Sequence, residues 1–160
     1  FSDVFASPGT ATYPYAMSLS GTDGAQDLFY EDYYFGRGVL SGIWSQQRAE
    51  NMGGFKSTAW YGSTADWMAT SNIYCQLPIP KIGVFGVFCD FGVFSNGVSV
   101  NSAVNTGIGV RFGKVFGLYL PVWMSKELSD SFGNSRYSEK IRFTLKLNPF
   151  NGDLKIGNLL

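Results

Sequence analysis

Apolar and polar residues alternate with a period of two along most of this chain. The clearest run covers residues 141–147, where Ile141 and Phe143 fall on one side and Arg142 and Thr144 on the other. Successive side chains of a β-strand point to opposite faces, so such a run is typical of a strand with one apolar and one polar face. Similar alternation occurs in residues 67–77, 85–91 and 107–113. The pattern predicts an all-β chain.

Turn-forming residues separate these runs. They gather in residues 78–81, 95–97, 112–114 and 131–134, which contain proline, glycine, asparagine or serine. Between such turns we expect about eight antiparallel strands, at residues 10–20, 37–45, 54–61, 67–77, 82–92, 101–112, 115–124 and 140–148. Residues 23–34 fit either a short helix or a long loop, and no segment shows a helical period with caps.

The length of the runs and the composition of their faces favour a membrane. A strand that crosses a bilayer at a tilt needs roughly 9–11 residues, whereas soluble strands average roughly 5–6. The apolar faces carry Leu, Ile, Val and Phe, and the opposite faces carry mainly Gly, Ser, Thr and Asn. A bilayer interior cannot satisfy an open strand edge, so strands of this kind close around a polar lumen. We therefore expect an antiparallel transmembrane β-barrel, either a complete small one or half of a larger one.

Three groups of candidate residues follow from this prediction. The lipid-facing candidates are Ile108, Val110, Phe112, Ile141, Phe143, Leu145 and Leu147. The lumen-facing candidates are Arg37, Lys56, Asp90, Arg111, Arg142 and Lys146. Aromatic residues near the ends of runs would form an interfacial girdle, and these are Tyr13, Trp60, Trp67, Tyr119 and Trp123. The alternative is a soluble β-barrel or sandwich, whose polar faces would be rich in Lys and Glu.

Two of the lumen-facing candidates, Arg37 and Lys56, lie close to glycines in the sequence. A glycine beside a long cation leaves that side chain room to cross an enclosed interior. We expect structural pairing of these cations with an inward carboxylate such as Asp66 or Asp90. Contact with a gate or a cargo is the alternative.

The composition agrees with a lipid-facing surface. Charged residues make up 15% of the chain, against roughly 25% in typical soluble domains. The net charge of zero offers no basic surface to a phosphate backbone, which excludes nucleic acid as a partner. Residues 91–110 are uncharged and long enough to span a bilayer as a helix, but their many glycines and polar groups exclude one. Any membrane span must therefore consist of strands.

Candidate catalytic chemistry is scarce. Histidine is absent, which removes the commonest general base and the commonest metal ligand. We expect no catalytic residue, no metal and no cofactor. Asp27, Glu31 and Asp32 are interpreted as a hydrated acidic loop, with cation binding as the alternative. We expect Cys75 and Cys89 to be two thiols on the apolar faces of their strands. A disulfide framework usually needs more cysteine pairs, and a zinc site needs further His or Cys ligands at closer spacing.

Six stretches carry a resemblance to a known family: residues 28–37, 45–47, 53–56, 67–78, 117–121 and 141–150. They resemble the C-terminal barrel-like region of large outer-membrane proteins of Bacteroidetes-type bacteria. In that group the region follows a gluzincin (M1-like) metallopeptidase domain, and it is similar in general style to the Omp85 surface-antigen barrels. No position here matches the zinc motif of the peptidase, so the resemblance implies no catalytic residue in this chain.

The pattern and the resemblance lead to one functional expectation. We expect residues 1–160 to form an outer-membrane β-barrel domain, the C-terminal part of a longer protein, in a Gram-negative bacterium. It would anchor or export a larger surface or periplasmic protein without catalysis of its own. Its partners would be the lipid bilayer, the barrel-assembly machinery and further strands or an upstream domain of the same protein. The alternatives are a small pore or translocation barrel and a soluble β-barrel that binds a lipid-like ligand.

Overall fold

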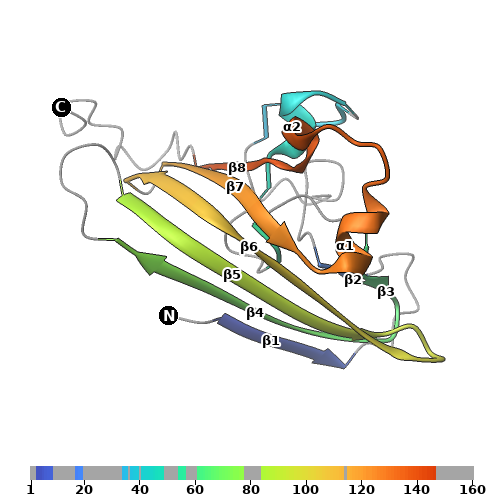
Figure 1. The fold of residues 1–160 in the computed structure, drawn as a ribbon. Coiled ribbons are helices and arrows are strands. Elements are labelled where there is room, and N and C mark those ends of the chain that lie inside the picture. The colour runs from blue at the N-terminus through green and yellow to red at the C-terminus, as the bar shows by residue number, and fades with distance from the viewer. Residues whose placement is uncertain are drawn as a thin grey trace.

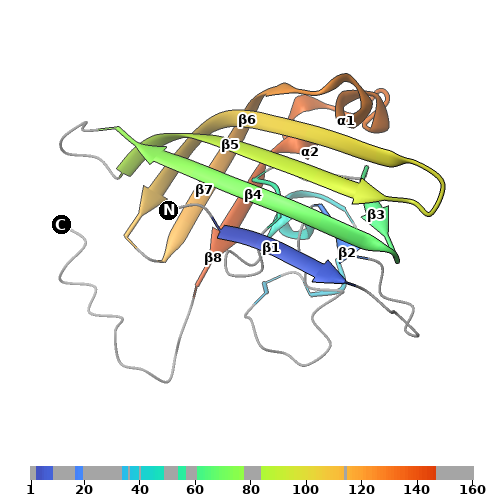
Figure 2. The ribbon, with the colours of Figure 1, turned by 90° about the horizontal axis from the view of Figure 1, so that it is seen from below.

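The chain folds mostly as antiparallel β-sheet. The computed structural model describes residues 3–8, 17–19, 34–35, 37–39, 41–48, 54–56, 61–77, 84–113 and 115–146. Within these residues, six strands form one sheet in the order β1-β4-β5-β6-β7-β8, and β2 and β3 form a separate pair. The larger sheet curls into a half-barrel (Figures 1 and 2).

The strands of the larger sheet differ greatly in length. Their bounds are β1 Asp3–Pro8, β4 Trp67–Gln76, β5 Val84–Ser95, β6 Val100–Phe112, β7 Phe116–Met124 and β8 Arg142–Leu145. The small pair consists of β2 Met17–Ser18 and β3 Ser63–Thr64. The four central strands therefore have 9–13 residues each, whereas both edge strands are shorter.

The strands from β4 to β8 follow one another in the sheet in chain order. Tight turns join β5 to β6 and β6 to β7. Between β5 and β6, the Asn96 side-chain oxygen accepts hydrogen bonds from the backbone nitrogens of Val98 (3.0 Å) and Ser99 (2.8 Å). Gly97 occupies the same turn with φ of 82°, a conformation that favours glycine. Gly113, with φ of 57°, lies in the turn between β6 and β7. These turns are where the sequence predicts them.

Three short helices lie beside the sheet in the described part of the chain. They are η1 Ile43–Gln46, α1 Lys126–Ser131 and α2 Tyr137–Lys140. The side chain of Gln46 donates to the backbone oxygen of Ser138 (2.9 Å), which joins the end of η1 to α2 (Figure 1). Tyr137 donates through its hydroxyl to the Pro121 oxygen (2.8 Å), which ties α2 to β7.

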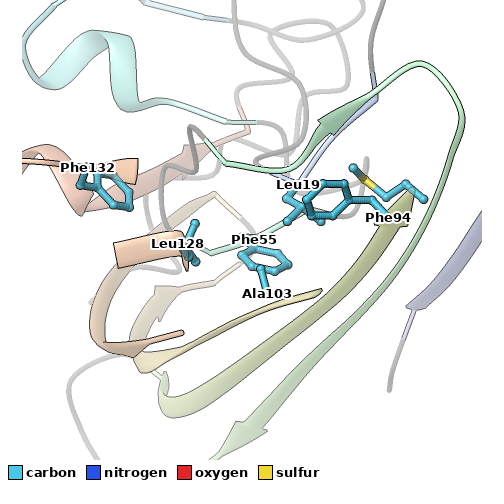
Figure 3. Close-up of a cluster of buried hydrophobic side chains, with 7 residues drawn as sticks. Leu19, Phe55, Phe94, Ala103, Leu128 and Phe132 are labelled. Carbon is cyan, nitrogen blue, oxygen red and sulfur yellow. The ribbon is translucent and has the colours of Figure 1, made fainter. Parts of the chain in front are cut away.

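An apolar cluster fills one end of the concave face. It consists of Leu19, Phe55, Met68, Phe94, Ala103, Leu128 and Phe132, all buried. Figure 3 shows Phe94 and Ala103 projecting from the sheet toward Phe55 and Leu19, which come from segments outside it. The Phe55 backbone nitrogen donates to the Leu19 oxygen (2.6 Å), so these two segments also hold one another. Burial of such side chains is the main stabilising contribution to a fold of this kind.

Five of the predicted strands coincide with observed ones, and three predictions need correction or completion. The ranges predicted at 67–77, 82–92, 101–112, 115–124 and 140–148 overlap β4 to β8, with β5 extending to Ser95 and β6 beginning at Val100. The strand predicted over residues 37–45 is wrong, because glycines 38 and 42 have φ of 86° and 78° and η1 begins at Ile43. The strand predicted over residues 54–61 is also wrong where it is described: residues 54–56 cross the concave face instead of joining the sheet.

The remaining differences lie near the ends of the chain and around the helices. Of the predicted strand 10–20, only residues 17–19 are described, and they contain β2. Strand β1 precedes every predicted strand, and it pairs with β4 from Asp3↔Asn72 to Pro8↔Trp67. The two α-helices have only six and four residues, so neither is long enough to produce a helical period in the sequence.

Candidate functional site

Three polar residues form a row across the middle of the concave face. Asn72 of β4 pairs with Asp90 of β5, which pairs with Asn105 of β6. All three are buried, and Asp90 and Asn105 have no exposed surface. Successive residues of a strand alternate between the two faces, and Asn72 pairs with Asp90, so the even-numbered residues of β4 and β5 share one face. This face is the concave face of the half-barrel.

The buried carboxylate of Asp90 accepts hydrogen bonds from three different segments. Its Oδ2 accepts from Asn105 Nδ2 (3.2 Å) and from the backbone nitrogen of Lys56 (2.5 Å). With the Asn72 amide oriented to satisfy its neighbours, Asn72 Nδ2 donates to Asp90 Oδ1 (2.8 Å) and to the Gly54 oxygen (2.8 Å). Asp90 therefore fixes residues 54–56 across the concave face. We call Asn72, Asp90, Asn105, Lys56 and Arg142 the polar cluster.

An aromatic layer lies next to the polar cluster on the same face. The rings of Tyr74 and Phe88 pack edge-on against Tyr119, at centroid distances of 6.5 and 6.0 Å. The Arg111 guanidinium stacks over the Tyr74 ring at 4.2 Å, and Arg111 Nε donates to the Tyr119 hydroxyl (3.1 Å). Cation–π contact and a hydrogen bond together hold this arginine in place.

Glycines make room for the aromatic layer. A Cβ at Gly109 would lie 2.6 Å from the Tyr74 ring and 3.2 Å from the Tyr119 ring. A Cβ at Gly86 would meet Tyr74, and one at Gly117 would meet the Tyr119 hydroxyl at 2.9 Å. These glycines belong to three different strands. The sequence pattern of glycine opposite apolar residues therefore has a packing cause: the rings of the aromatic layer occupy the space in which a Cβ would lie.

Comparison of the chain with protein-family models, with curated proteins and with solved structures finds no match. The chemistry of the site therefore rests on its own residues. The Asp90 carboxylate accepts three hydrogen bonds, and Arg111 is held between two tyrosines. Among the described residues, no group of three or more His, Cys, Asp or Glu could hold a metal ion. The described helices include none that is long and apolar enough to span a membrane.

The structure brings three of the lumen-facing candidates together and leaves the others apart. Asp90, Lys56 and Arg142 meet at the polar cluster, where Lys56 and Arg142 both interact electrostatically with Asp90. Lys56 thus interacts with Asp90 through its backbone nitrogen and its charge, while Asp66 is exposed. Arg111 lies in the aromatic layer.

The other two lumen-facing candidates lie away from the polar cluster. Arg37 stacks over Tyr34 at 5.2 Å, outside the sheet strands. Lys146 follows β8, and its backbone nitrogen donates to the Val115 oxygen (2.8 Å). Sequence spacing gave no basis for separating these two from the clustered candidates.

The lipid-facing candidates divide in a similar way. Ile108, Val110 and Phe112 lie on the convex face of β6, where Ile108 and Phe112 are exposed and Val110 is half-buried. Ile141 and Leu145 are half-buried, and Leu147 lies outside the described residues. Phe143 needs correction: it is only 5% exposed, because Trp44 of η1 and Phe116 of β7 cover its ring at centroid distances of 6.2 and 6.3 Å.

The predicted girdle is wrong at one position. Tyr119 has no exposed surface and lies in the aromatic layer, because its place in β7 directs it to the concave face opposite Arg142. Trp67 and Trp123 are exposed and lie at or near strand ends. Tyr13 and Trp60 lie outside the described residues.

The two cysteines are described by the structure, whereas the acidic loop is not. Cys75 and Cys89 are free thiols on the convex faces of β4 and β5, opposite Val87 and Ile73 respectively. The acidic residues 27, 31 and 32 lie outside the described residues.

Sequence reasoning missed the residues that cover the sheet, Gln47 and Arg48 in particular. Gln47 forms a parallel bridge with Phe143, and the Arg48 backbone nitrogen donates to the Phe143 oxygen (3.0 Å). Both residues are buried. No local pattern could have found them, because their burial depends on contact with β8, almost a hundred residues away in the sequence.

Proposed function

We propose that this chain is a non-catalytic membrane module: the convex face of its half-barrel contacts acyl chains, and its concave face belongs to an enclosed polar interior. The observation that carries this proposal is the unequal chemistry of the two faces. Apolar side chains are exposed on the convex face of the long strands, while Asp90, Asn105 and Arg142 are buried on the concave face.

The convex face supports contact with lipid over four adjacent strands. Its exposed apolar residues include Ile73 of β4, Val87 and Phe91 of β5, and Ile108 and Phe112 of β6. Register places these side chains on one face with Leu118 and Leu120 of β7, and the convex positions of β4 to β7 contain no charged residue. Soluble monomers rarely expose a continuous apolar patch of this extent, whereas a lipid-facing surface requires one.

The lengths of the strands support the same proposal. β4, β5, β6 and β7 have 10, 12, 13 and 9 residues, and a tilted strand needs roughly 9–11 residues to cross a bilayer. An open sheet edge is not tolerated in the hydrocarbon region. Further strands, from the same protein or from a partner, would therefore have to close the half-barrel.

The filled interior supports an anchor or export module over an open pore. Leu19, Phe55 and Gln47 come from segments outside the six-stranded sheet, and all three are buried. Residues 54–56 are fixed across the concave face by Asp90. An interior blocked in this way suits a domain that holds a larger surface or periplasmic protein in the outer membrane of a Gram-negative bacterium. Its assembly there would depend on the barrel-assembly machinery.

The experiment that tests this proposal measures the environment of the convex face. A spin label is attached to Phe91→Cys in a chain whose two native cysteines are replaced by alanine, and the protein is reconstituted in phospholipid vesicles. Collision with molecular oxygen, which concentrates in lipid, is compared with collision with a water-soluble nickel complex. We expect the label at position 91 to favour oxygen strongly.

The matched control is Val98→Cys in the same background, because Val98 is 95% exposed in the turn between β5 and β6. Its label should favour the nickel complex. Equal nickel collision at positions 91 and 98 would contradict the proposal, as would a full chain that stays monodisperse in water without detergent. The latter result would favour a soluble β-barrel. Ion conductance across planar bilayers would favour the pore.

A further inference from the structure

The two cysteines of the chain lie diagonally across the neighbouring strands β4 and β5. Cys75 of β4 pairs with Val87, and Cys89 of β5 pairs with Ile73. Because alternate residues of a strand share a face, both thiols project from the convex face. Both are free, Cys75 is exposed and Cys89 is half-buried. The fold therefore brings the two thiols together from different strands on an accessible surface.

The diagonal spacing decides which chemistry the two thiols can share. Diagonal neighbours on one face of an antiparallel pair have their backbones roughly 7–8 Å apart, whereas a disulfide usually needs Cα atoms within about 6.8 Å of each other. The thiols are therefore too far apart to join directly without movement of the backbone. Each sulfur can still rotate about its Cα–Cβ bond toward an atom placed between them. This spacing favours a shared ligand over a disulfide.

The surroundings of the thiols select the kind of ligand. Their convex neighbours Ile73, Val87 and Ile108 are apolar, and the convex positions of β4 to β7 carry no charge. Calcium and magnesium need oxygen ligands. Structural zinc needs four ligands, and no group of three or more His, Cys, Asp or Glu in the described part of the chain could hold a metal. Two thiolates alone suit a soft cation, and Cu(I) is the one that accepts two such ligands.

We propose that Cys75 and Cys89 form a two-coordinate Cu(I) site on the convex face. As Cu(I) binds, each S–H bond is replaced by an S–Cu bond, and two protons pass to the solvent. Copper keeps its charge of plus one, so the step needs no oxidant or reductant. Because the thiolates are the ligands, the affinity should rise with pH. The site depends on the register of β4 and β5, so it does not rest on whether the convex face contacts lipid.

The experiment is an anaerobic titration of the reduced full chain in detergent. Cu(I) is supplied by a coloured chelator, whose absorbance falls as the protein takes the metal. We expect the wild-type chain to take one Cu(I) per chain. Cys75→Ser and Cys89→Ser should each lose this binding, because each removes one of the two ligands. A chain with both substitutions is the control for copper bound by the four methionines.

A second measurement follows the two thiols directly. Bound Cu(I) should protect both cysteines from alkylation by iodoacetamide, which mass spectrometry detects at each position. Copper uptake by the wild-type chain no greater than by the doubly substituted chain would overturn the proposal. So would one Cu(I) shared between two chains, or alkylation of both thiols at an unchanged rate in the presence of Cu(I).

A shifted thiol tests the register on which the site depends. Ile73→Cys combined with Cys75→Ser places a thiol directly opposite Cys89, where the backbones are roughly 5.5 Å apart and a disulfide can form. Oxidised glutathione should produce an intramolecular disulfide in this variant, while the wild-type chain stays reduced under the same conditions. A wild-type chain that forms the disulfide equally readily would overturn the diagonal geometry and the copper site with it.

Discussion

Within β5, Asp90 is fully buried among hydrogen-bond donors, whereas Phe91, the next residue, is 45% exposed on the opposite face. The same contrast extends across the sheet: Asn72 and Asn105 continue the buried row, and Ile73 and Ile108 continue the exposed one. The contrast between the two faces shows that burial in this fold does not follow hydrophobicity alone. Segments from outside the sheet cover the concave face, which is partly polar.

The largest expected effect comes from breaking the buried side of this contrast. Asp90→Ala removes the acceptor of Lys56, Asn72 and Asn105 and takes away the carboxylate whose charge stabilises that of Arg142. We expect a loss of about 3–5 kcal/mol in the free energy of unfolding, measured by urea denaturation in detergent. Asp66→Ala, at an exposed position, is the control. Equal stability of the two variants would show that the polar cluster contributes little.

A charge on the convex side sharpens the comparison from the other direction. Val87→Arg places a cation in the middle of the exposed apolar face. In a lipid bilayer we expect it to cost about 2–4 kcal/mol of stability, because the charge would lie in hydrocarbon. Val98→Arg, in the exposed turn, should cost almost nothing. Indistinguishable unfolding of both variants in vesicles would remove the case for a lipid-facing convex surface.

A smaller effect is expected where the concave face is most tightly packed. Gly109→Ala adds a methyl group that would meet the rings of Tyr74 and Tyr119. Overpacking of this kind costs about 1–3 kcal/mol. Adding Tyr74→Leu in the same chain removes one of the two rings, so the penalty of Gly109→Ala should shrink in a double-mutant cycle. Additive losses in that cycle would mean that the two positions do not contact one another.

The smallest effect concerns the turn that keeps the two faces in register. Gly97→Ala forces an L-residue into a backbone with φ of 82°, at a cost of about 1 kcal/mol. A slip of one residue between β5 and β6 would bring Phe91 inside and Asp90 outside. We expect thermal unfolding at a slightly lower temperature with an unchanged fold by circular dichroism. An unchanged midpoint would show that the turn adapts without strain.

Local sequence located the central sheet but not what covers it. The alternation in β4 to β7 reports directly which side chains share a face, and Gly97 and Gly113 mark turns by their backbone requirements. Asp90 and Arg142 could be placed on the inner face by counting alone. The strand predicted at residues 37–45 is wrong because Gly38 and Gly42 both have positive φ, which interrupts an extended backbone, and η1 begins directly after Gly42.

The sequence by itself therefore determined the strands β4 to β8 and the two-sided chemistry of the sheet, since a period of two is a property of neighbouring residues. Only the tertiary structure decided that Tyr119 lies inside, that Phe143 is covered by Trp44, and that Lys56, Asp90 and Arg142 meet. These contacts join residues 34 to 99 positions apart in the chain. The free energy of these contacts depends on which segments fold across the sheet, and a local sequence pattern does not predict those segments.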